Sequence, residues 1–154
     1  MQAVLKDELP LVRLVEKFHP VSEVGVKSSA EYDADLPFLF YSAVITPDKE
    51  GERIFKTISS LKGRDRKSGI EDAGLRNFVV WKDKSGVMRM LMIPRSSHRP
   101  ECFFAPEGER LMVSPGTIDM CGIIVVPRED DFRRITDKDL SRIFSEVAFP
   151  QFEK

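Results

Sequence analysis

The sequence predicts an α+β domain in which helices pack on a mainly antiparallel sheet. Three observations lead to this fold class: apolar residues repeat at helical spacing in several segments, strand-like runs lie between those segments, and a short loop joins two of the runs as a hairpin. The elements follow one another as strand, helix, hairpin, short strand, strand and helix. That order favours helices packed on an antiparallel sheet.

Two helices are predicted in the first half of the chain. A short one follows Pro10, and its apolar side is formed by Leu11, Leu14, Val15 and Phe18. In the second helix Thr46 is the expected N-cap, Pro47 suits the first helical position, and Gly63 ends the run. Asp48 and Glu50 favour the positive end of that helix. Its apolar stripe is Ile54, Phe55, Ile58 and Leu61.

A third helix is predicted near the C-terminus. Thr136 is the expected N-cap, with Asp139 three residues later as a weak capping box, and Pro150 ends the helix. We expect its apolar stripe to pack on the sheet. The stripe is Leu140, Ile143, Phe144 and Val147.

Five runs of apolar and β-branched residues are predicted to be strands. They are Phe38–Ile45, Asn77–Lys82, Val87–Ile93, the short Leu111–Val113 and the fully covered Cys121–Val126. The four residues Asp83–Gly86 form the expected hairpin loop. Two polar stretches, Lys27–Asp35 and Lys62–Gly74, are predicted to be loops.

Length, charge and cysteine usage limit the class of protein. The 154 residues fit one domain spanning 1–154, and 24 basic against 25 acidic residues leave no basic field to hold nucleic acid. No apolar run approaches the roughly 20 residues of a membrane helix, and Lys6, Asp7 and Glu8 interrupt any signal-peptide core. Cys102 and Cys121 fit a reducing compartment. We therefore expect a cytoplasmic protein with no nucleic-acid or membrane partner.

The densest group of polar residues is Pro94–Pro100, directly after a predicted strand. The guanidinium groups of Arg95 and Arg99 and the imidazole of His98 can grip a phosphate or carboxylate through charge-assisted hydrogen bonds. This requires a turn between Ser96 and Arg99, because an extended chain would point His98 to the opposite face. The alternative is a solvated loop whose arginines pair with nearby glutamates.

A second polar segment, Ser114–Asp119, lies between two predicted strands. Its glycine and hydroxyl residues can present backbone N–H groups to an anion, although Ser-Pro-Gly is equally ordinary turn chemistry. The segment matches neither of the two glycine-rich phosphate-binding fingerprints.

The sequence lacks the residue spacings that metal sites and serine hydrolases require. The two histidines and two cysteines have no metal-ligand spacing, so no metal site is expected, and no serine-hydrolase motif occurs. The carboxylates of Glu129–Asp131 precede a predicted helix, where a solvated or dipole-facing role is expected.

The segment Gly122–Phe132 resembles the strand-to-helix unit of the histidine-triad superfamily. The longer stretch Ser114–Val147 is similar to the C-terminal part of the nucleotide phosphorylase branch of that superfamily, which includes GDP-L-galactose phosphorylase and diadenosine tetraphosphate phosphorylase. The sequence is most similar to an uncharacterised bacterial family akin to that branch, with which it shares the pattern Pro94-Arg95-x-x-His98-Arg99-Pro100-x-Cys102-Phe103-Phe104, followed by Ser114-Pro115 and Asp131-Phe132. The superfamily usually carries a histidine where this chain has Asp130 and Asp131.

The resemblance implies a catalytic His-x-His-x-Gln strand whose middle histidine attacks phosphorus and holds the nucleotide covalently. This chain has only His19 and His98, and so it lacks that motif, although Gln2 fits the motif's last position. We therefore expect the chain to begin just after the catalytic strand of a longer protein, through a cloning boundary, a split gene or a late start codon. In that case it is a histidine-triad-like C-terminal half, inactive alone.

The resemblance also implies the ligands and partners. Arg95, His98 and Arg99 would bind the phosphates of a nucleotide or sugar phosphate, with Ser114 and Asp119 as secondary ligands and no cofactor. The partner would be the missing N-terminal half or a second copy, and apolar surface meant for the missing half would be exposed. The alternative is a stand-alone, non-catalytic module that binds a nucleotide or a protein.

Overall fold

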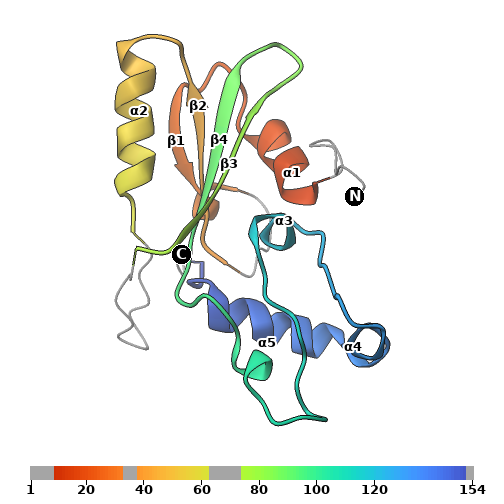
Figure 1. Ribbon diagram of the computed structural model, residues 1–154. Coiled ribbons are helices and arrows are strands. Elements are labelled where there is room, and N and C mark those ends of the chain that lie inside the picture. The colour runs from red at the N-terminus through yellow and green to blue at the C-terminus, as the bar shows by residue number, and fades with distance from the viewer. Residues whose placement is uncertain (1–8, 33–37, 63–73, 152–154) are drawn as a thin grey trace.

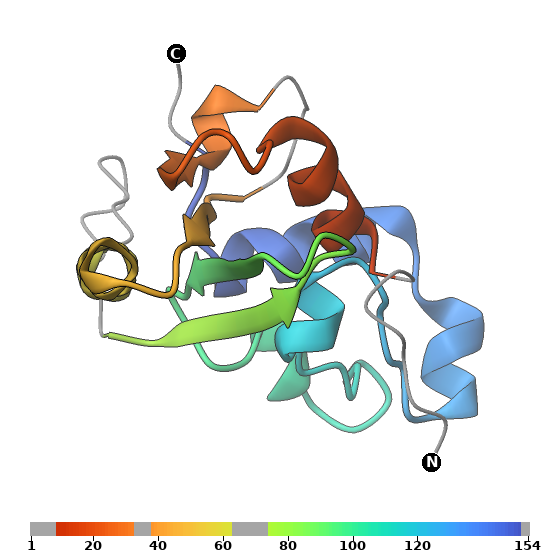
Figure 2. The same cartoon turned by 90° about the horizontal axis from the view of Figure 1, so that it is seen from above.

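The computed structural model describes residues 9–32, 38–62 and 74–151. It confirms the α+β fold class: helices pack around a four-stranded antiparallel sheet. Figures 1 and 2 show α2 on one side of the sheet and α1 on the other, and in the view of Figure 1 α5 and α4 lie below the sheet. The helices are α1 (Pro10–Phe18), α2 (Lys49–Ser60), α3 (Thr117–Met120), α4 (Glu129–Arg134) and α5 (Asp137–Val147), with single 3₁₀ turns at Ser29–Glu31 (η2) and Glu101–Phe103 (η3).

The strands of the sheet lie in the order β1-β2-β4-β3, and each neighbouring pair is antiparallel. The predicted hairpin is present and joins the last two strands. Its loop is held by the Asp83 carboxylate, which accepts hydrogen bonds from the backbone N–H groups of Ser85 and Val87. Gly86 supplies the positive φ of 78° that the turn needs. The strands are β1 (Gly25–Ser28), β2 (Tyr41–Ile45), β3 (Arg76–Lys82) and β4 (Met88–Pro94).

The three predicted helices are present, but the N-cap of α2 differs from the prediction. Asp48, rather than Thr46, caps the helix: its carboxylate accepts from the Gly51 N–H at 3.0 Å. Thr46 instead donates its hydroxyl proton to that same carboxylate at 2.7 Å. An ionised side chain at this position also benefits from the positive helix end. The predicted stop residue Gly63 lies outside the described residues, and α2 ends at Ser60.

The predicted strand Cys121–Val126 is wrong. Cys121 ends the turn of α3, and Gly122 has a φ of 103°, which breaks an extended path. The Val125 N–H then donates to the Asp119 carboxylate at 2.7 Å, so this backbone is held by a side chain rather than by a strand. The segment keeps its apolar role, because Ile124 and Val126 pack on a cluster beneath it.

Two other predictions of local structure need correction. Leu111–Val113 is not a strand: Leu111 donates its N–H to the Cys102 carbonyl, and Met112 donates to the Asp131 carboxylate. The stretch predicted as the loop Lys27–Asp35 contains the end of β1 and η2, and its last three residues lie outside the described residues. Most of the loop predicted at Lys62–Gly74 also lies outside them. The strand predicted from Phe38 begins only at Tyr41.

Strand β4 is covered on both faces. Along β4, Met90 and Met92 join the cluster that α2 covers, whereas Leu91 and Ile93 join the cluster of α1. This alternation is what a strand buried on both sides requires. Helix α5 departs from its predicted packing: Val147 reaches the α1 cluster, but Ile143 packs on the loop residues Cys102, Leu111 and Val113. Only the C-terminal end of that helix therefore lies under the sheet.

Candidate functional site

The side chain of Arg95 joins four segments at the end of β4. Arg95 is 4% exposed, and its guanidinium donates to three backbone carbonyls. Nε reaches the Val147 oxygen at 2.8 Å, Nη1 the Pro115 oxygen at 2.8 Å, and Nη2 the His98 oxygen at 3.2 Å. The end of α5 and the two polar loops predicted from sequence are therefore brought together by one side chain.

This arrangement gives Arg95 a positioning role. Burial lowers the pKa of its guanidinium, and the carboxylate of Asp119 opposes that shift. Because an arginine remains charged even so, the cation needs several oxygen partners in the interior, and the carbonyls provide them. Its predicted role as a direct phosphate ligand would require these contacts to break.

The chain turns sharply after Arg95, as a convergent site requires. The Ser97 hydroxyl donates to the Arg99 carbonyl at 2.8 Å and accepts from the Arg99 N–H at 3.3 Å. Ser96 ties the start of the turn to α5, because its hydroxyl donates to the Glu146 carbonyl at 3.0 Å. The turn 96–99 is thus fixed by its own serines and by the helix beside it.

Hydrogen-bond donors are left over on this turn. The backbone N–H groups of Ser97 and His98 donate to no other group in the described part of the chain, and both His98 and Arg99 are exposed. The Arg99 guanidinium carbon lies 4.1 Å from the centre of the Phe103 ring, a cation–π contact that limits its motion. Beside the turn is a hollow of about 300 Å³. It is lined by Ser96, Ser97, Arg99, Glu101, Ser145, Glu146, Ala148, Phe149 and Pro150.

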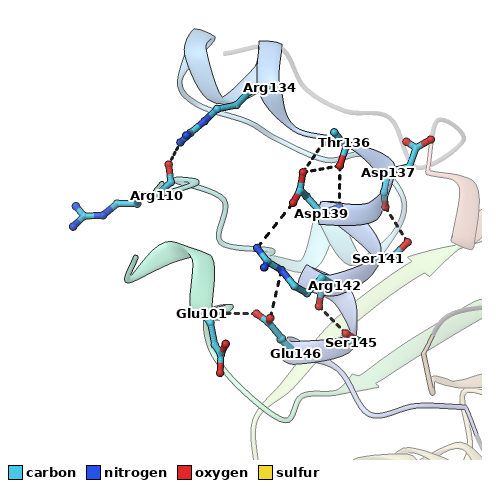
Figure 3. Close-up of polar contacts among 10 residues, drawn as sticks. All are labelled: Glu101, Arg110, Arg134, Thr136, Asp137, Asp139, Ser141, Arg142, Ser145 and Glu146. Atoms are coloured by element: carbon cyan, nitrogen blue, oxygen red, sulfur yellow. Dashed lines mark hydrogen bonds and ion pairs between the residues drawn. The ribbon is translucent and has the colours of Figure 1, made fainter. Parts of the chain in front are cut away.

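Two of the residues that line this hollow are glutamates, Glu101 and Glu146, which bring negative charge to it. The Glu146 carboxylate accepts from the Glu101 N–H at 2.8 Å and lies 3.7 Å from Nε of Arg142. Figure 3 shows that Glu146 points toward the Glu101 backbone and Arg142, whereas the Glu101 side chain points away from Glu146. Arg142, which also lies 4.0 Å from the Asp139 carboxylate, offsets the charge of Glu146, and Arg99 and Glu101 offset each other, so this hollow has no excess positive charge.

Ser114 and Asp119, the secondary ligands expected from sequence, are placed differently from each other. Ser114 is exposed, next to the Pro115 carbonyl that Arg95 binds. Asp119 is buried, and its carboxylate accepts from the N–H groups of Gly116 at 2.8 Å and Val125 at 2.7 Å. Asp119 thus holds its own loop together. Gln2 lies outside the described residues.

Sequence reasoning missed the role of Asp131. It was expected to be solvated or dipole-facing, but it is fully buried in the first turn of α4. It accepts from the Met112 N–H at 2.8 Å and from Nη2 of Arg134 at 2.7 Å. The hydrogen bond from Met112 is the main cause that lowers the pKa of this carboxyl, and Arg134 and Arg128 lower it further. The spacing of Asp131 and Arg134, three residues apart on a helix, was the available signal.

Arg134, which pairs with Asp131, also binds the loop around residues 108–110. Arg134 donates to the carbonyl of Gly108 at 2.6 Å. It donates to the carbonyl of Arg110 as well, as Figure 3 shows. A hollow of about 330 Å³ lies here. It is lined by three arginines, three acidic residues and a glycine: Arg110, Arg128, Arg134, Glu107, Asp130, Asp131 and Gly108. The charges of these residues balance, so the hollow has no net attraction for an anion.

The other histidine is part of a buried network. Nδ1 of His19 lies 2.7 Å from the Ser42 hydroxyl, and Nε2 lies 2.9 Å from the Glu23 carbonyl. Since a carbonyl only accepts, Nε2 carries the proton and Nδ1 accepts from Ser42. The ring is 1% exposed, and both of its nitrogens are engaged. Among the described residues, no group of three or more histidine, cysteine, aspartate or glutamate side chains is placed to hold a metal ion.

Comparisons with known proteins add no relative: no protein family, no curated protein and no solved structure matches the chain. In residues 9–32, 38–62 and 74–151, no helix is both long enough and apolar enough to cross a bilayer.

Proposed function

We propose that this chain is the ligand-binding C-terminal half of a nucleotidyltransferase- or nucleotide phosphorylase-like protein, and that it binds a phosphate group at the turn 96–99. One observation carries the proposal. The backbone N–H groups of Ser97 and His98 donate to no other group in the described residues, the His98 side chain is exposed, and Ser97 and Arg99 line one hollow. Adjacent backbone N–H groups and a guanidinium are the donors that phosphate oxygens accept from most strongly.

In this proposal, the arginines of the motif have different roles. Arg99 is exposed and contacts the ligand, whereas Arg95 holds the turn in place through the carbonyls of His98, Pro115 and Val147. A turn fixed in advance binds an anion without an additional ordering cost. The nucleotide or sugar phosphate class comes from the sequence resemblance.

We also propose that the isolated chain does not catalyse nucleotide transfer or phosphorolysis. The chain has two histidines, and His19 is enclosed with both nitrogens engaged. His98 has no neighbouring group in the described residues that would orient its ring as a nucleophile. The covalent intermediate of the family that the chain resembles therefore requires residues that are not in this sequence.

Calorimetric titration of this chain with GDP and with guanosine tests the proposal. We expect GDP to bind, guanosine to bind at least about tenfold more weakly, and Arg99→Ala to lower the GDP affinity about tenfold, as expected for one charge-assisted contact. Arg53→Ala is the matched control, because Arg53 is an exposed arginine on α2 that pairs with Glu50. Equal GDP affinity in the folded Arg99→Ala variant would refute the site.

A second function, a stand-alone module that binds a partner protein, is favoured by a different observation: apolar side chains beside β3 are left to solvent. An upstream reading frame encoding His-x-His-x-Gln would refute the stand-alone version. If the chain is instead the C-terminal half of a longer protein, as proposed first, its partner is the N-terminal half or a second copy of the chain. We also propose a cytoplasmic location, which the free thiols of Cys102 and Cys121 support.

A further inference from the structure

Two phenylalanine rings continue the surface from Arg99. The Arg99 guanidinium carbon lies 4.1 Å from the centre of the Phe103 ring, and the rings of Phe103 and Phe104 meet edge to face with 5.4 Å between their centres. Both rings follow the turn 96–99 directly, because the 3₁₀ turn η3 begins only two residues after Arg99. Arg99, Phe103 and Phe104 therefore form a connected row of side chains that starts at the proposed phosphate site.

The ring of Phe104, at the far end of this row, is open to solvent. Phe104 is 68% exposed, whereas Phe103 is partly buried. An edge-to-face contact engages at most one face of a ring, so at least one face of Phe104 is free. Phe55, which was expected on the buried stripe of α2, and Phe132 of α4 are exposed as well. Neither of them makes a ring–ring or cation–π contact within the described ranges, so Phe104 alone of the three is coupled to a cation.

The guanidinium of Arg99 is stacked but not hydrogen-bonded. Its N–H groups donate to no described group, and no described carboxylate lies within ion-pair distance of it. Stacking uses the flat face of a guanidinium and leaves the N–H groups on its rim available. One ligand can therefore accept hydrogen bonds from Arg99 while another part of the same ligand lies on Phe104.

The surroundings of Phe104 favour a single flat ring as the occupant of its free face. The acidic residues on either side of it in the chain, Glu101 and Glu107, are exposed, so the apolar surface is limited to the rings. That is less than the continuous apolar patch that a polypeptide contact requires. A nucleobase needs only one aromatic face, and every base can stack on it. Only the Phe103 ring separates Arg99 from Phe104, which is comparable with the span from phosphate to base in one nucleotide.

We infer that Phe104 stacks on the base of the ligand whose phosphate binds at the turn 96–99. The inference rests on the proposed function and narrows it: the ligand is a nucleotide rather than a sugar phosphate. The hollow beside the turn has no excess positive charge, so an anion gains little there from the electrostatic field. The contact with the base then supplies affinity that a phosphate alone does not obtain.

Calorimetric titration of the chain with guanosine monophosphate and with ribose 5-phosphate tests this inference, because the base is what distinguishes the two ligands. We expect the nucleotide to bind about tenfold more tightly. Phe104→Leu keeps an apolar side chain but removes the flat face. It should lower the affinity for guanosine monophosphate about tenfold and leave that for ribose 5-phosphate unchanged. Phe132→Leu is the matched control, because Phe132 is 69% exposed on α4, and it should change neither affinity.

Phe104→Trp provides a second, positive test. The larger indole face should bind guanosine monophosphate at least as tightly as the unmodified chain does. The nucleotide should also quench the fluorescence of the introduced indole, whereas ribose 5-phosphate should not. The native Trp81 is 7% exposed and hydrogen-bonded to Glu16, so its emission serves as a constant background.

Three outcomes would overturn the inference. Equal affinity of the unmodified chain for the two ligands would remove the stacking role and retain the phosphate site. An equal loss of both ligands in folded Phe104→Leu would show that the ring supports the turn instead of contacting the base. Binding of neither ligand would refute the phosphate site itself, and the role of Phe104 with it.

Discussion

The guanidinium of Arg95 donates to the carbonyl oxygen of Pro115 at 2.8 Å, across 20 residues of sequence. This bond brings the loop after β4 against the loop before α3, although neither loop has regular secondary structure. The same guanidinium reaches Val147, 52 residues away, at the end of α5. One buried cation therefore fixes the relative position of the segments that carry the proposed phosphate site.

Replacement of Arg95 should destabilise the whole domain. Lysine keeps the charge, but its three N–H donors share one nitrogen, whereas Arg95 reaches the three carbonyls from three separate nitrogens, Nε, Nη1 and Nη2. Because the site is buried, we expect Arg95→Lys to lower the free energy of unfolding by about 3 kcal/mol. Urea denaturation followed by circular dichroism measures the change. Arg99→Lys is the matched control on the exposed turn and should change the stability by less than about 0.5 kcal/mol; equal losses in both variants would contradict the positioning role.

Asp131 should contribute stability that disappears in acid. Its carboxyl has a lowered pKa because it accepts from Met112 and pairs with Arg134. A depressed folded-state pKa means that the contribution is complete above the unfolded value of about 4 and is lost as the pH falls through the folded value. We expect Asp131→Asn to cost about 2 kcal/mol at pH 7, with the difference from the unmodified protein shrinking below pH 4. Denaturation midpoints from pH 7 to pH 3 measure this, with the exposed Asp130→Asn as control. A difference that stays constant with pH would contradict it.

His19 should make the domain less stable at mildly acidic pH. Burial is the main cause that lowers its pKa, and the positive charges of Lys27 and Arg89 act in the same direction. The unfolded chain therefore binds a proton near pH 6.5 that the folded chain does not, and stability falls as the pH drops below about 6.5. The network supports the neutral ring, because Tyr32, whose pKa burial raises to about 12, keeps its hydroxyl proton near Ser42.

The variant His19→Gln isolates this effect. It should be less stable at pH 7.5, but its stability should change less between pH 7.5 and pH 5.5 than that of the unmodified protein. His98→Gln is the matched control, because it makes the same exchange at the exposed histidine of the chain. Thermal unfolding at several pH values measures both variants, and an identical pH dependence in His19→Gln would exclude the buried ring as its origin.

Local signals predicted the helices, whereas the site depends on distant contacts. The Thr136–Asp139 capping box was readable because both partners lie within one turn, and their hydrogen bonds are present. The apolar run Cys121–Val126 has the composition of a strand, but the Asp119 carboxylate captures the Val125 N–H and Gly122 turns the chain. The role of Arg95 could not be inferred from its motif, because two of its three carbonyl partners come from distant segments.

The last prediction concerns covalent chemistry. A histidine attacks phosphorus only if one ring nitrogen is unprotonated, accessible and aimed by a partner on the other nitrogen. His19 is not accessible to a nucleotide, because the residue is 1% exposed and its Nδ1 and Nε2 atoms are hydrogen-bonded to Ser42 and Glu23. His98 is exposed, but its ring has no hydrogen-bond partner among the described residues. Incubation with a radiolabelled GDP-sugar or dinucleoside polyphosphate should therefore leave the protein unlabelled after acid-free gel electrophoresis. Label that appears on the unmodified chain and is absent from His98→Gln would identify His98 as a nucleophile and overturn the proposal that this chain is a non-catalytic half.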